Sequence, residues 1–155
     1  MRRSFKFLAG VTLLEIMLVL AIAAMIIIMS IRYYQSASAS QQANSVLQEI
    51  QAITAAADSL ALGSGAGYAN TSVTTLGAVL PGGTAAFTAP WGGAITISSP
   101  LATSYQVYIA SVPVSVCPLV VSKLLQNSSY AGLSPATASN CGTSAGGSIS
   151  YTYHP

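Results

Sequence analysis

Few side chains in this sequence could take part in acid–base, metal or thiol chemistry. They comprise three carboxylates, one imidazole and two thiols, at Glu15, Glu49, Asp58, His154, Cys117 and Cys141. A catalytic centre needs a nucleophile beside a base, or carboxylates that face each other. The three carboxylates fall on one predicted helix and the histidine is next to the last residue, so we predict no enzymatic activity and no cofactor.

Glu15 is the most unusual of these residues because it lies inside an apolar stretch. The 21 residues from Val11 to Ile31 contain no other charge, no glycine and no proline. A helix of that length can cross a hydrocarbon core of about 30 Å, where a carboxylate costs a few kcal/mol. Two explanations remain open: either Glu15 reaches water at the cytoplasmic interface, or it faces a partner charge.

The cations around this stretch predict its orientation. Arg2, Arg3 and Lys6 precede it, and Arg32 alone follows it closely. Cytoplasmic flanks carry the excess of Lys and Arg, so we expect the N-terminus in the cytoplasm and the remainder outside. A secretory signal peptide has a shorter apolar region followed by a small-residue cleavage site, and no such site follows Ile31.

The helix is predicted to continue beyond the apolar stretch, over residues 11–62. Apolar residues recur at steps of three and four, as on one face of an amphipathic helix, at Ala43, Val46, Leu47, Ile50, Ile53, Ala57 and Leu60. The serine-rich segment Ser36–Ser40 is its weak point, because serine hydroxyls compete for backbone hydrogen bonds. Gly63 is the expected left-handed cap.

Residues 63–155 predict a small α+β head. We expect a surface loop over 63–81 with a short helix near 75–80, and then strands over 94–98, 105–110 and 148–153, with Phe87 a candidate for a further strand. A second helix is expected over 114–126, with Pro113 or Pro118 in its first turn. The alternating strands predict an antiparallel sheet with one face on a helix.

Cys117 and Cys141 both lie in the exported part of the chain. An even pair in an oxidising compartment predicts a disulfide, which would close a loop of 23 intervening residues and stabilise the head by roughly 3 to 3.5 kcal/mol. A metal site is the alternative, but two cysteines and His154 make a poor ligand set.

The segment Ala9–Glu15 resembles the prepilin signature of type IV pilins and type II secretion pseudopilins: a short basic leader ending in Gly, then a hydrophobic residue, Thr, two aliphatic residues, Glu and an apolar helix. The resemblance implies cleavage between Gly10 and Val11 by a prepilin peptidase, and N-methylation of Val11. It also implies that Glu15 faces the N-terminal ammonium of a neighbouring subunit. Two charges buried together attract strongly, whereas either one alone is penalised.

The resemblance also implies a domain layout. Residues 1–10 would be the leader, 11–62 the long helix with 11–31 as membrane span and then filament core, and 63–155 the head. In the head, the Trp91–Gly93 turn, the Val112–Pro113 segment before Cys117 and the aromatic last strand look like type IVb pilins, including the thin-pilus PilS group. The leader is shorter than many type IVb leaders, and the helix lacks the mid-helix proline common in type IVa pilins.

The implied function is that of a pilin, a structural protein with an inner-membrane precursor and an extracellular pilus as its final location. Its partners would be further copies of the chain, the prepilin peptidase and the inner-membrane assembly machinery. The filament would serve adhesion, aggregation, conjugation or DNA uptake. The alternatives are a secretion pseudopilin and a membrane-anchored binding domain that never assembles.

The composition agrees with an assembling protein that has no nucleic-acid site. Charged residues make up 5% of the chain, against about 25% in typical proteins. The formal charge of +2 becomes −1 without the leader, because two cations then face three carboxylates. The chain therefore lacks the basic face that nucleic-acid binding requires.

Overall fold

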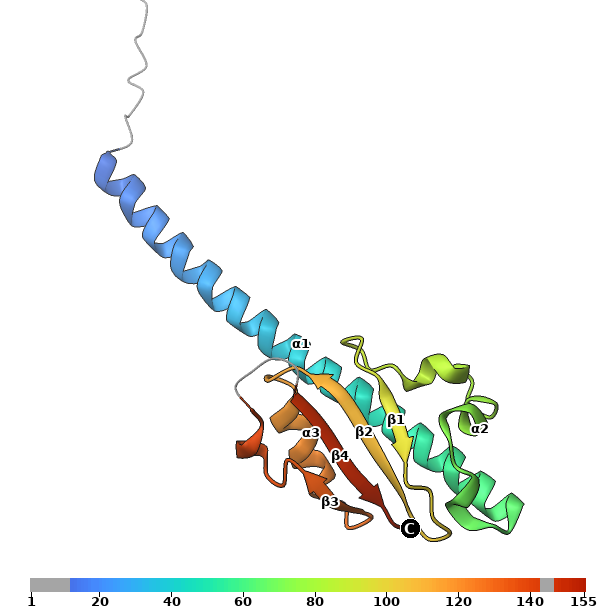
Figure 1. Cartoon of the computed structure of the whole chain (residues 1–155). Coiled ribbons are helices and arrows are strands. Elements are labelled where there is room, and N and C mark those ends of the chain that lie inside the picture. The colour runs from blue at the N-terminus through green and yellow to red at the C-terminus, as the bar shows by residue number, and fades with distance from the viewer. Residues whose placement is uncertain (1–11, 143–146) are drawn as a thin grey trace, which may run out of the picture. The chain divides into compact units, whose positions relative to one another are not determined.

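The computed structural model describes residues 12–142 and 147–155. The chain is α+β, with helices and strands in the order α1 (Leu13–Ser64), α2 (Val73–Gly77), β1 (Ile95–Ser98), β2 (Tyr105–Val112), α3 (Cys117–Leu124), β3 (Tyr130–Ser134) and β4 (Gly147–Tyr153) (Figure 1). Short 3-10 helices are η1 (Gly67–Asn70), η2 (Gly83–Phe87) and η3 (Ala138–Asn140). The chain divides into a helical unit that ends at Ala37 and a larger unit, Ser38–Pro155.

The helix α1 is continuous over 52 residues, including the serine-rich segment. The predicted weak point at residues 36–40 therefore stays helical. Its serines alternate with Ala37 and Ala39, and alanine has the highest helix propensity. Ala39 is also the first residue of α1 to be buried in the core of the larger unit.

The predicted cap at Gly63 is wrong by two residues. The helix runs through Gly63 to Ser64, and the left-handed residue is Gly65, with φ of 65°. The Ser64 hydroxyl accepts a hydrogen bond from the Ala66 N–H at 3.4 Å, so the turn closes one residue after the helix ends. Either Gly63 or Gly65 can adopt positive φ without steric cost. The hydrogen bond of Ser64 spans Gly65, the glycine that does so.

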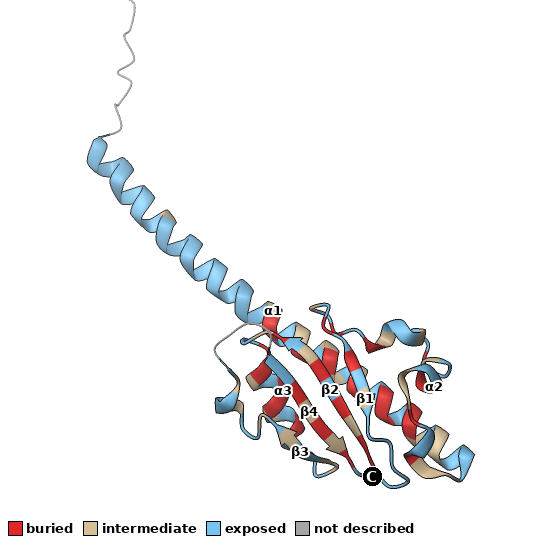
Figure 2. Ribbon diagram, in the orientation of Figure 1, coloured by how far each residue is buried: buried red, intermediate tan, exposed pale blue. Residues whose placement is uncertain are grey.

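The four strands form one antiparallel sheet in the order β1-β2-β4-β3. Ile95 pairs with Ile109, which in turn pairs with Ile149, and these three side chains are buried on the same face. The neighbouring residues along each strand, Thr96 on β1 and Tyr108 on β2, are exposed on the other face. Figure 2 shows this alternation along β2 and β4, so the sheet has one apolar face, as predicted.

The apolar face of the sheet shares a core with the second half of α1. The predicted stripe is confirmed: five of its members are buried and the other two pack against them, namely Ala43, Val46, Ile50, Ile53 and Ala57, with Leu47 and Leu60 at the margin. The sheet contributes Val107, Ile109 and Tyr151 to the same core. Burial of each large aliphatic side chain contributes about 1.5 to 3 kcal/mol, so this core dominates the stability of the larger unit.

The turn before β1 needs a glycine for close packing. A Cβ on Gly93 would lie 2.0 Å from the Ala110 carbonyl oxygen, which is a steric clash. The Trp91 indole N–H donates to that same oxygen at 3.1 Å. The predicted Trp91–Gly93 turn is therefore confirmed, and it fastens the loop that precedes β1 to the last part of β2.

Two parts of the head differ from the sequence prediction. Phe87 ends the 3-10 helix η2 and its ring is buried, so the suggested strand there is wrong; only Thr88 bridges to Ala94. The strand β3 was not predicted, because its sequence is short, rich in small residues and contains Gly132 at a φ of 60°. The short helix α2 begins at Val73, two residues before the expected 75–80, behind the capping residue Ser72.

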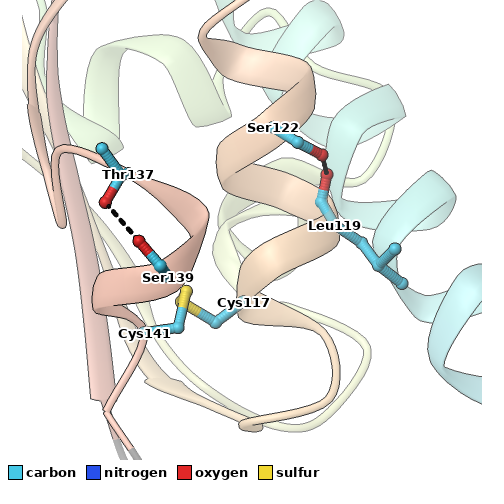
Figure 3. The surroundings of a disulfide bond; sticks show 6 residues. All are labelled: Cys117, Leu119, Ser122, Thr137, Ser139 and Cys141. Carbon is cyan, nitrogen blue, oxygen red and sulfur yellow. Dashed lines mark hydrogen bonds between the residues drawn. A yellow bond between two sulfur atoms is a disulfide. The ribbon is translucent and has the colours of Figure 1, made fainter.

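The helix α3 carries the first cysteine of a disulfide. It begins at Cys117, with Pro118 in its first turn, so Pro118 rather than Pro113 marks the start. The sulfur of Cys117 is bonded to that of Cys141, which follows η3 (Figure 3). The predicted disulfide is confirmed, and the 23 residues that it encloses contain β3.

We expect loss of this disulfide to destabilise the head. The double variant Cys117→Ser/Cys141→Ser should lose about 3 kcal/mol in its free energy of unfolding, because the unfolded chain is no longer cross-linked. Thermal melts of the full chain in detergent, with and without reductant, measure the effect. Reductant should lower the melting temperature of the parent protein and leave that of the double variant unchanged.

The matched control is Ser122→Ala on the same helix. The Ser122 hydroxyl donates only to the Leu119 carbonyl one turn earlier (Figure 3). Its removal should therefore change the melting temperature little. A parent protein that melts at the same temperature in both redox states would contradict a stabilising disulfide.

Candidate functional site

The first part of α1 presents apolar side chains in every direction. Exposed large hydrophobic residues follow one another along it, at Leu13, Leu14, Ile16, Met17, Leu18, Val19, Leu20, Ile22, Met25, Ile26, Ile27, Ile28, Met29, Ile31, Tyr33 and Tyr34. Leu13 is 77% exposed, and Figure 2 shows the same exposure along this part of the helix. Among the described residues, α1 is the one helix long and apolar enough to cross a membrane. Such a surface needs lipid or protein around it.

Glu15 lies in the first turn of α1 and is exposed. Thr12 precedes the helix, and its hydroxyl oxygen accepts a hydrogen bond from the Glu15 N–H at 3.3 Å. Thr12 and Glu15 therefore have the spacing of a capping box, with Thr12 at the N-cap and an acidic residue three positions later. The negative charge also lies at the positive end of the helix dipole. The predicted cleavage residues Gly10 and Val11 lie outside the described residues.

This local role of Glu15 was not part of the sequence prediction. The signal that could have revealed it is the Thr12-x-x-Glu15 spacing directly before an apolar helix. Ser30, near the end of the apolar stretch, has its hydroxyl hydrogen-bonded within α1: it donates to the Ile26 carbonyl at 2.8 Å. This bond leaves the Ser30 hydroxyl compatible with an apolar environment.

Asp58 forms the centre of a polar cluster that the sequence did not predict. Its two carboxylate oxygens accept hydrogen bonds from the Tyr68 hydroxyl at 2.5 Å and the Tyr153 hydroxyl at 3.1 Å. The rings of both tyrosines also contact Tyr105, with centroids 5.3 Å apart in each case. Asp58 therefore connects α1 with η1 and with the last strand, β4, inside the larger unit.

The surroundings of these tyrosines keep their hydroxyls protonated. Burial is the main cause that raises the pKa of Tyr153 to about 12, and the hydrogen bond to Asp58 and its negative charge add to the rise. Burial, followed by the same bond and charge, raises the pKa of Tyr68 further. The buried Tyr105 hydroxyl has no hydrogen-bond partner among the described residues, and burial raises its pKa as well.

The remaining carboxylate, Glu49, stands apart from Asp58, and the histidine lies at an exposed position after β4. Glu49 and Asp58 are nine positions apart on α1, which is about 13 Å along the helix axis. His154 is exposed, and its backbone N–H donates to the Ser129 carbonyl at 2.8 Å. The disulfide also removes both thiolates, so the alternative of a cysteine-ligated metal site is wrong. Across residues 12–142 and 147–155, no three metal-ligating side chains come together.

Comparison of the chain with protein families, with curated proteins and with solved structures finds no match.

We expect the larger unit to lose stability in alkaline solution. The unfolded pKa of a tyrosine is about 10, and in the folded chain that of Tyr153 is raised to about 12. The folded state therefore retains a proton that the unfolded state has lost. This contribution is complete below about pH 10 and disappears as the pH rises through 12. Denaturant unfolding at a series of pH values measures it.

The variant Tyr153→Phe should reduce the slope of stability against pH in this window. Tyr108→Phe is the matched control, because Tyr108 is exposed on the outer face of the same sheet. A slope that is the same in Tyr153→Phe as in the parent protein would contradict the assignment.

The carboxylate itself can be tested at neutral pH. Asp58→Ala leaves the part-buried hydroxyls of Tyr68 and Tyr153 without their acceptor, and an unsatisfied buried polar group costs about 1 to 3 kcal/mol. The free energy of unfolding should therefore fall by about 2 kcal/mol or more. An unchanged free energy of unfolding would show that Asp58 contributes nothing to the core.

Proposed function

We propose that this chain is a pilin, a subunit that polymerises through α1 into a filament of the type IV class. The observation that carries the proposal is the change of surface along one continuous helix. The part up to Tyr34 exposes apolar side chains all round, whereas the part from Ala39 onward buries a single stripe in a folded head. One carboxylate, Glu15, stands in the first turn of the apolar part.

The apolar part of α1 suits two environments in succession. Before assembly it would span the membrane, with Arg2, Arg3 and Lys6 on the cytoplasmic side. Removal of residues 1–10 by a prepilin peptidase would then free a new N-terminus at Val11, which would be methylated. In the filament, the same apolar surfaces would pack on those of neighbouring copies, as in helical bundles.

The charge on Glu15 supports assembly over permanent anchoring. A lone carboxylate in a hydrocarbon core is costly, and intramembrane acids commonly face a partner. In the proposed filament the partner is the N-terminal ammonium of a neighbouring copy, which sets the register between subunits. The hydrogen bond from the Glu15 N–H to Thr12 starts the helix at a defined residue, and so fixes where this charge stands along it.

The head supports a structural role without catalysis. Its core combines the α1 stripe, one apolar sheet face and the Cys117–Cys141 disulfide. A cysteine at the start of a helix, a later cysteine beyond it and an aromatic last strand favour the type IVb subclass through the stated resemblance. A pseudopilin shares the N-terminal features, but the disulfide and the scarcity of charge favour a pilin. The mature protein would leave the inner membrane as part of an extracellular pilus.

We expect Glu15→Ala to insert normally into the membrane and to abolish or disorder filaments. Glu15→Gln is the sharper variant, because glutamine also serves at this position of a capping box but has no charge. If Glu15 pairs with an ammonium, both variants fail to assemble; if it only caps the helix, glutamine restores assembly. Electron microscopy of cell-surface filaments and immunoblots of the membrane fraction measure the two properties.

Normal filaments from both variants would overturn the charge pairing. Mass spectrometry of the purified protein tests the processing separately: the mature chain should begin at Val11 and carry an N-methyl group. Monomers that retain the leader, with no filaments from the parent protein, would instead indicate a membrane-anchored domain that does not assemble. Short periplasmic polymers without surface filaments would indicate a pseudopilin.

A further inference from the structure

The unit Ser38–Pro155 contains only three charged side chains, Glu49, Asp58 and Lys123. Asp58 is occupied by the hydroxyls of Tyr68 and Tyr153. Glu49 and Lys123 therefore remain as one acid and one base of opposite charge. Neither forms an ion pair within the parts of the chain that the structure describes.

Glu49 is an incompletely satisfied carboxylate on one flank of α1. The residue is half-buried, and its Oε2 atom is buried without a hydrogen-bond partner among the described residues. Loss of water from the carboxylate raises its pKa. A carboxylate that has lost part of its hydration in this way is unfavourable, so a cation that approaches the exposed part of the same carboxylate from outside the chain would stabilise its negative charge.

Lys123 lies at the edge of a recess between α1 and α3. Two adjoining hollows of about 270 Å³ and 160 Å³ make up this recess, and Leu47 and Lys123 line both. The walls of the larger hollow are mixed, with Ala43, Leu119 and the amide of Asn44. Lys123 itself is exposed. A cation beside a part-apolar, part-polar recess suits a small acidic protein surface.

Glu49 and Lys123 face opposite sides of α1, so they cannot meet in one copy. Leu47 and Gln51 both line the recess beside Lys123. Glu49 lies two positions from each of them, which is about 200° around a helix of 3.6 residues per turn. Of the four side chains one turn from Glu49, Val46 and Ile53 point into the core, whereas the short Ser45 and Ala52 lie on the side away from it and leave space for an approaching lysine.

We propose that the recess beside Lys123 receives the Glu49 flank of a second copy, with the Lys123 ammonium paired to the Glu49 carboxylate. This inference rests on the proposed function, since it names a contact between heads in the same polymer. Each copy supplies its acid on one side and its base on the other. Such a head-to-tail contact leaves a free acid at one end and a free base at the other, so it can add copies without limit.

Arg32 is the other described cation that a neighbouring Glu49 could meet. It stands on α1 just after the apolar stretch, in the unit that ends at Ala37 and so outside the head. Lys123, by contrast, adjoins a recess that can hold the neighbouring surface. We therefore assign the contact with Glu49 to Lys123. The experiment below distinguishes this assignment from a contact between Glu49 and Arg32.

Charge reversal in the full chain tests the pairing. Glu49→Lys and Lys123→Glu should each lower the yield of filaments at least about tenfold, because each brings like charges together. The double variant Glu49→Lys/Lys123→Glu should restore the yield to within about twofold of the parent, since the opposite charges meet again. Lys123 also lies in the last turn of α3, but a loss of that helix-end effect could not be rescued by a change at Glu49.

The control is the double variant Glu49→Lys/Arg32→Glu. Rescue by this variant, and not by the Lys123 pair, would overturn the assignment. Melting temperatures of each variant as detergent-solubilised monomer identify any that fail to fold.

Coexpression of a Glu49→Cys chain with a Lys123→Cys chain provides a second measurement. A disulfide-linked heterodimer in filaments is expected; its absence in filaments that do form would overturn the pairing. Absence of filaments from the parent protein would instead overturn the proposed function.

Discussion

The packing of one face of α1 on one face of the sheet is the contact on which the rest of the structure depends. A small antiparallel sheet needs its apolar side covered, and the second half of α1 has a stripe that needs burial. Val46, Ile50 and Ile53 of the helix and Ile109 and Tyr151 of the sheet are buried together in one core. The helices α2 and α3 add their buried side chains to this same core.

Charge is scarce in this chain, and the three carboxylates and Lys123 each have a distinct environment in the described structure. Glu15 stands at the start of a helix, and Asp58 is enclosed by tyrosine hydroxyls. Glu49 keeps one oxygen out of water without a partner, and Lys123 borders a recess. A surface of this composition relies on shape and on neutral hydrogen bonds for most of its contacts. A single charge pair then has unusual weight in deciding which surfaces meet.

The sequence allowed prediction of those elements whose signal is periodic. The α1 stripe, the strands β1, β2 and β4, and the helix α3 follow from spacing, β-branched residues and a proline at a helix start. The disulfide followed from the parity and location of the cysteines. The strand β3 was not predicted because Tyr130–Ser134 contains small residues and a glycine, which have low strand propensity. Hydrogen bonding to β4 makes this segment a strand.

The parts of the site that could not be predicted depend on contacts between distant residues. Asp58 and Tyr153 are 95 positions apart, and nothing in either local sequence indicates that they meet. The recess beside Lys123 exists only because α3 lies next to α1. By contrast, the cap formed by Thr12 is local, and its Thr-x-x-Glu spacing was available from the sequence. Propensity alone also does not rank Gly63 against Gly65 as the residue that ends α1, because either glycine can adopt the positive φ that Gly65 has.

The disulfide has one consequence for how the head withstands damage. Cys117 and Cys141 bracket 23 residues, which include most of α3 and, after it, exposed residues such as Asn127, Ser128 and Ala136. Exposed polar segments of this kind are the usual targets of proteases. If a protease cuts one peptide bond inside this bracket, both products remain covalently joined, and β4 stays tethered to the chain that carries α1. In the filament proposed above, such a cut would therefore leave α1 and β4 of the subunit in one covalent unit.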